Sequence, residues 1–129
     1  KDYVEGMYLM LQQNKPEDYV LATGITTSIR DFIKMAFKEL GIEIKFKGNG
    51  LSEVGYIHNN GSHKIKKGQI VVKVNPKYFR PTEVDLLIGD ASKAKRQLGW
   101  IPKYDLKMLI KEMIESDLNI IKKENTIVN

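Results

Sequence analysis

Residues 90–102 read DASKAKRQLGWIP and carry the clearest folding signal in the chain. Asp90 is placed to cap a short helix that runs through Leu98, and Gly99 is suited to the left-handed conformation that ends a helix. Trp100 follows at once and brings a large ring that a protein core would bury. We interpret this stretch as a structural element and not as a source of chemistry.

Hydrophobic residues at helical spacing predict three further helices outside that stretch. Each begins at a residue whose side chain suits an N-cap. The predicted helices are 2–13 with Asp2 as cap and a stripe of Val4, Met7, Tyr8 and Leu11, 28–40 with Ser28 as cap, and 105–121 with Asp105 as cap.

Three short strands are predicted at 19–23, 42–47 and 69–74, and the second of them alternates apolar and charged residues. Between the last two lies a glycine-rich stretch, 48–68, which we expect to be a long loop, and a loop of that length is usually functional or mobile. About four helices and three short strands indicate a small α/β unit. With 129 residues, the chain is expected to form a single domain.

The composition excludes several classes of protein. The chain contains no cysteine, which excludes disulfides and cysteine-ligated metals. No apolar run approaches the length of a membrane span, so no membrane partner is expected. The net charge of +5 fits either nucleic acid or an anionic small molecule. Because the lysines and arginines are spread along the chain, we expect no nucleic-acid partner.

The segment 78–85, YFRPTEVD, holds the candidate ligand-binding residues. Arg80 offers a planar fork of donors that suits phosphate oxygens, and Pro81 restricts it to extended conformations. Glu83 can accept two hydrogen bonds, which suits the diol of a ribose. A nucleoside diphosphate presents both groups close together. The alternative is a surface ion pair between Arg80 and Glu83, which stabilises a protein by at most about 1 kcal/mol.

Other familiar motifs of catalysis and cofactor binding are missing from the sequence. The pair Gly48 and Gly50 begins a G-x-G-x-x-G pattern, but Glu53 stands where its third glycine belongs. No tyrosine is followed four residues later by lysine. His58 and His63 lie in the expected loop without the helical spacing of a metal pair, so we expect solvated histidines and no metal site.

Several of these segments resemble known enzymes. The stretch 90–102 resembles the C-terminal helix region of the extended short-chain dehydrogenase/reductase superfamily. A narrower resemblance, to the GDP-mannose 4,6-dehydratases, is carried by YFRPTEVD with IGDASKA behind it, by KDYVEGMYLMLQQNKPEDYVLATG at 1–24 and by TSIRDFIKMAFKELGI at 27–42. It covers nearly the whole chain and is weakest at 56–67.

This resemblance implies a lyase of sugar-nucleotide metabolism. Such enzymes use NADP, held by an N-terminal Rossmann domain, to oxidise C4 of GDP-mannose, eliminate water across C5 and C6, and return the hydride to C6. The glycine-rich turn and the Tyr-x-x-x-Lys pair belong to that domain and do not occur here. Residues 1–129 would then form the C-terminal substrate domain, inactive alone. No catalytic, NADP-binding or metal-binding residue carries over.

The resemblance assigns a role to two residues only. Arg80 matches the arginine that contacts the phosphates of GDP-mannose or GDP, and Glu83 matches the acid that holds the ribose. The family further implies a homo-oligomer in the cytoplasm. Two alternatives stay open: a free-standing GDP-sugar binding module without catalysis, and a nucleic-acid-binding protein.

Overall fold

A computed structural model describes the backbone of residues 1–82 and 87–127 and the side chains of these residues up to 123. Four α-helices and a three-stranded antiparallel sheet occur within them, which confirms the expected α/β class. The chain divides into two compact units. The first comprises the described parts of 1–27 and 84–109, and the second comprises those of 28–83 and 110–129.

The first unit is built on two helices, α1 (Asp2–Leu11) and α3 (Ser92–Leu98). Ala94, Leu98 and Trp100 form its buried core, and Trp100 is only 2% exposed. Around this core pack five partly buried residues: Leu9, Met10, Tyr19, Leu21 and Ala91. Two of the roles predicted for the stretch 90–102 are confirmed: Gly99 adopts a left-handed conformation with a φ of 69°, and Trp100 fills the core. The N-cap of α3 is Ala91 and not Asp90, whose Oδ1 accepts a 2.8 Å hydrogen bond from the backbone N–H of Ser92.

Two expectations about the first helix are wrong. The apolar stripe that predicted it, which includes Val4 and Leu11, is exposed, because α1 faces the core with Gly6, Leu9 and Met10 instead. A side chain at position 6 would collide with Leu21 and approach Trp100, so glycine allows this close packing. Asp2 does not cap α1, since its carboxylate binds the backbone N–H groups of residues 103 and 104.

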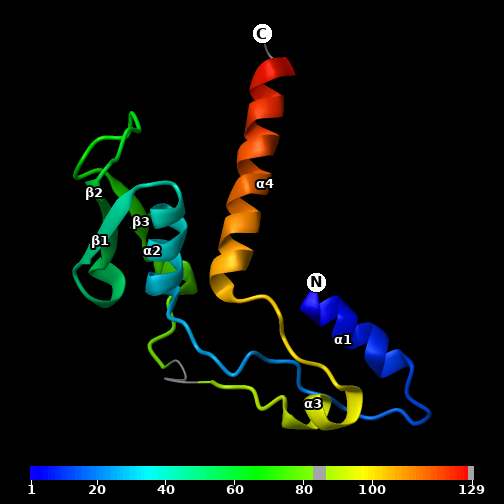
Figure 1. The fold of residues 1–129 in the computed structure, drawn as a ribbon. Helices are drawn as coiled ribbons and strands as arrows, with labels where there is room; N and C mark the ends of the chain where they lie inside the picture. The colour runs from blue at the N-terminus through cyan, green and yellow to red at the C-terminus, as the bar shows by residue number, and fades with distance from the viewer. Residues whose placement is uncertain (83–86, 128–129) are drawn as a thin grey trace. The chain divides into compact units, whose positions relative to one another are not determined.

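The second unit places α2 (Ile29–Glu39) against the sheet (Figure 1). Ser28 caps α2 as predicted, because its Oγ accepts a 3.0 Å hydrogen bond from the backbone N–H of Asp31. The strand order is β1-β2-β3. The strands are β1 (Glu43–Lys47), β2 (Val54–Asn59) and β3 (Ile70–Lys73), and their buried residues include Ile44 and Ile57.

The observed strands correct two predictions. Residues 19–23 form no strand. Val20 and Ala22 lie against Gly89, whose own segment, 87–91, is likewise not a strand. The expected loop 48–68 contains the 3₁₀-helix η1 (Gly50–Ser52) and all of β2, which lies in the middle of the sheet. Neither error changes the predicted class, since three short strands are still present.

The last helix, α4 (Leu106–Ile127), begins where predicted. Asp105 Oδ1 accepts a 2.7 Å hydrogen bond from the backbone N–H of Met108, which is the capping contact expected from the sequence. Among the helices of the described residues, none combines the length and the apolar character needed to cross a bilayer.

Candidate functional site

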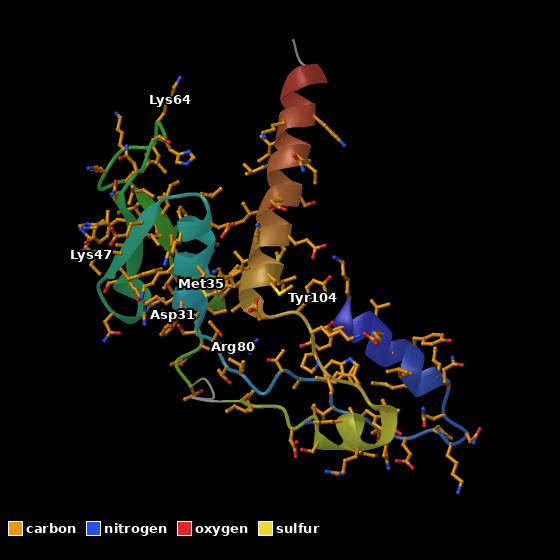
Figure 2. All side chains as sticks on the ribbon, viewed as in Figure 1. Asp31, Met35, Lys47, Lys64, Arg80 and Tyr104 are labelled. Carbon is orange, nitrogen blue, oxygen red and sulfur yellow. The ribbon has the colours of Figure 1, made fainter. Side chains whose placement is uncertain are left out.

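Arg80 lies in the second unit, directly after η2 (Pro76–Tyr78), the 3₁₀-helix that follows β3 (Figure 2). The local sequence fixes this turn: Asn75 Oδ1 accepts a 3.0 Å hydrogen bond from the backbone N–H of Lys77, and Pro76 occupies the first helical position. The chain then leaves the turn in an extended conformation at Phe79. Arg80 therefore projects from a short, capped turn.

The side chain of Arg80 is exposed, and within the described residues it makes no hydrogen bond or ion pair. A guanidinium carries five N–H donors in a rigid fork, and here all of them remain available to an anion. Glu83, the second predicted ligand residue, lies outside the described residues. The pairing of a phosphate-binding arginine with a ribose-binding acid therefore stays a prediction.

An open cleft of about 430 Å³ lies elsewhere in the second unit. Its lining residues are Arg30, Lys34, Lys45, Phe46, Gly48 and Glu53, and Arg80 is not among them. Arg30 is held in place by Glu53, whose Oε1 accepts hydrogen bonds from Nε at 2.8 Å and from Nη2. The guanidinium also lies 5.7 Å from the centre of the Phe46 ring.

The cleft was missed by the sequence analysis because nothing local identifies it. Arg30 and Glu53 are 23 positions apart, and no sequence pattern links the two. The Arg30–Glu53 pair is half-exposed on the arginine side, so we assign it a structural contribution of about 1 kcal/mol or less. It orients the arginine, but it also neutralises the charge that an anionic ligand would need.

Both histidines are exposed and contact other groups of the protein. His58 lies in β2, not in a loop, and its Nε2 is 2.9 Å from Lys45 Nζ. His63 Nε2 is 2.7 Å from the backbone carbonyl oxygen of Leu40. Within the described residues no group of histidines and carboxylates could hold a metal ion.

Perturbed pKa values occur at structural positions. The pKa of Asp31 is lowered, first by the hydrogen bond from Ser28 and then by Lys34, and the pKa of Asp90 is lowered by hydrogen bonds from Ser92. The pKa of Lys103 is raised by its hydrogen bond to Glu5. Each shift favours the charged form of a group in a local contact, which is the opposite of what a neutral general acid needs.

Comparison with known proteins gives these features a context. A family model described as GDP-mannose 4,6 dehydratase matches residues 1–113. The chain is 51% identical over 122 residues to a GDP-mannose 4,6 dehydratase of Drosophila melanogaster, a match that covers 95% of this chain and 29% of the relative. It is 48% identical over 121 residues to one of Vibrio cholerae serotype O1, with 92% and 32% covered.

A GDP-mannose 4,6 dehydratase of Dictyostelium discoideum is 49% identical over 122 residues, with 95% of this chain and 32% of the relative covered. The chain belongs to the GDP-mannose 4,6-dehydratase family. It spans about a third of the length of the curated relatives that it matches.

Proposed function

We propose that this chain is the part of a GDP-mannose 4,6-dehydratase that binds the substrate nucleotide. The whole enzyme would convert GDP-mannose to GDP-4-keto-6-deoxymannose in the cytoplasm. The observation that carries the proposal is the family match over residues 1–113, within which Arg80 is exposed and unpaired by any described residue. Arg80 would bind the diphosphate of GDP, and Glu83 would accept hydrogen bonds from the ribose.

NADP would be held by a Rossmann domain outside this chain and would supply the hydride acceptor and donor. The residues present do not fit that cofactor, because the sequence has neither a G-x-G-x-x-G turn nor a Tyr-x-x-x-Lys pair. We therefore assign this chain a binding role and no chemical step. The complete enzyme would act as a homo-oligomer.

The binding role is tested by titrating the 129-residue chain with GDP in a calorimeter. Arg80→Ala should weaken GDP binding by about 1.5–3 kcal/mol, the range for hydrogen bonds to charged groups. Arg96→Ala is the matched control, since Arg96 is also exposed but lies on α3 in the other unit. Equal affinities of the wild type and the Arg80 variant would refute the assignment.

The catalytic part of the proposal needs a separate experiment. The purified chain is incubated with GDP-mannose and NADP, and the products are analysed by mass spectrometry. We expect no loss of water from the sugar, because the chain lacks the Tyr-x-x-x-Lys pair. Turnover by the purified chain would contradict the proposal.

The alternative of a free-standing binding module is distinguished by the mass of the native polypeptide. An antibody raised against residues 60–68 would capture this polypeptide from the source cells. A mass far above that of 129 residues would support the proposed enzyme. A mass equal to that of the chain would favour the module.

A further inference from the structure

The positive charge of the chain is concentrated in one segment of the second unit. Residues 43–77, which contain the whole sheet, carry seven lysines and two glutamates, a net charge of +5. This equals the net charge of the entire chain, so all other residues together sum to zero. The lysines and arginines themselves are spread along the chain, and this segment stands out because it holds only two acidic residues.

The lysines of this segment are not neutralised by carboxylates. The seven are Lys45, Lys47, Lys64, Lys66, Lys67, Lys73 and Lys77; all are exposed, and none forms an ion pair with a described residue. Three make other contacts: Lys45 with His58, and Lys47 and Lys77 with the rings of Tyr56 and Tyr78. One of the two glutamates, Glu53, is already bound by Arg30.

Part of this charge lies at the end of the sheet where β3 stops and the chain continues to Arg80. Lys47 pairs with Val54, and Val54 pairs with Lys73, so the two lysines share one row across the sheet. β3 ends at Lys73 and leads through η2, which contains Lys77, to Arg80. Lys47, Lys73 and Lys77 are called the near lysines below.

Three of the other four lysines lie at the opposite end of the same strands. Lys64, Lys66 and Lys67, called the far lysines below, belong to the connection between β2 and β3. Figure 2 shows Lys64 at the far end of the unit from Arg80. The near lysines and the far lysines therefore carry the same charge within one unit, but they lie at different distances from Arg80.

We infer that the lysines of the sheet speed the capture of the nucleotide at Arg80 by electrostatic steering, a role that rests on the proposed function. A nucleoside diphosphate carries several negative charges, and a field of one sign raises the rate at which such a ligand meets its site. Unpaired lysines are suited to this role, because their charge is not cancelled locally. They do not need to contact the bound ligand.

The experiment measures association and dissociation rates of GDP with the 129-residue chain by ³¹P line-shape analysis at low ionic strength. The near variant is Lys47→Gln with Lys73→Gln and Lys77→Gln, and the far variant is Lys64→Gln with Lys66→Gln and Lys67→Gln. Both lose the same charge. We expect the near variant to lower the association rate about three- to tenfold and the far variant to lower it less, with dissociation rates changed less than about twofold.

Salt supplies a second test, because the screening length is about 8 Å at physiological ionic strength and shrinks to about 3 Å at 1 M. The difference between the wild type and the near variant should disappear in high salt. An association rate that is the same in wild type and near variant at low salt would overturn the inference. So would a near variant that alters mainly the dissociation rate, since that indicates direct contact.

The two proposals fail in different ways. If GDP binding depends on Arg80 but not on the lysines, the steering inference is wrong and the proposed function stands. If GDP does not bind, or binds equally well to the Arg80→Ala variant, the proposed function is overturned and the inference with it.

Discussion

The indole Nε1 of Trp100 donates a 2.8 Å hydrogen bond to the backbone carbonyl oxygen of Asp2, 98 positions earlier in the chain. The carboxylate of the same Asp2 accepts hydrogen bonds from the backbone N–H groups of Lys103 at 2.6 Å and Tyr104 at 2.8 Å. One residue at the start of α1 thus binds the segment that follows α3. These hydrogen bonds join two segments of the first unit that are distant in sequence.

We expect Trp100→Phe to lower the free energy of unfolding by about 1–3 kcal/mol, because the substitution removes the indole N–H that binds the carbonyl oxygen of Asp2 and shrinks a buried ring. Urea denaturation followed by far-ultraviolet circular dichroism measures this change without relying on the tryptophan. Ile101→Ala is the control at the adjacent, exposed position and should change stability by about 0.5 kcal/mol or less. Equal effects of the two substitutions would show that the contacts of the Trp100 indole contribute little.

Stability in acid should depend on Asp2. The N–H group of Tyr104, followed by that of Lys103, lowers the pKa of Asp2 below its ordinary value, although burial opposes this. The contribution of Asp2 is therefore fully present above the pKa that it has in the unfolded chain, about 3.9, and is lost as the pH falls through the lower folded value.

The measurement is the urea midpoint of the wild type and Asp2→Asn at several pH values from 7 to 3. Asp2→Asn should be the less stable protein at pH 7, and the difference should shrink in acid, where the wild-type carboxylate also loses its charge. Asp117→Asn, at an exposed position of α4, serves as the control. A difference that stays constant across this range would argue against an ionised Asp2.

Ser28→Ala should destabilise the second unit by about 0.5–2 kcal/mol, because α2 loses the side chain that caps it. Ser28 Oγ accepts from the N–H of Asp31 at 3.0 Å and donates to Asp31 Oδ2 at 2.7 Å. Ser28→Asn should restore most of the loss, since asparagine caps as well as serine. Ser62→Ala, at an exposed position between β2 and β3, should have little effect in the same thermal unfolding experiment.

The ribose contact proposed for Glu83 predicts a preference among nucleotides. Wild-type chain should bind GDP more tightly than 2′-deoxy-GDP by about 1.5–3 kcal/mol, because the deoxy ligand lacks one hydroxyl that the carboxylate would accept from. Glu83→Ala should bind both ligands with similar affinity. Calorimetry of the four combinations isolates the contact, and a variant that keeps the full preference would exclude it.

Local signals in the sequence predicted the helices best. Ser28, Gly99 and Asp105 act within a few residues of themselves, so their roles as caps and helix ends can be inferred without a fold. The strands were predicted less well. β2 contains Gly55, and glycine is depleted in strands, yet pairing with β1 on one side and β3 on the other makes it the central strand.

The sequence by itself determined the presence of the four helices, the α/β class and, through its motifs, the family to which the chain belongs. Only the tertiary structure decided which groups meet across long separations: Asp2 with Trp100, Arg30 with Glu53, and Lys47 in one row with Lys73. The physical reason is the range of the interactions. Caps and periodicity act over one or two turns, whereas these contacts join residues that the chain brings together only when it folds.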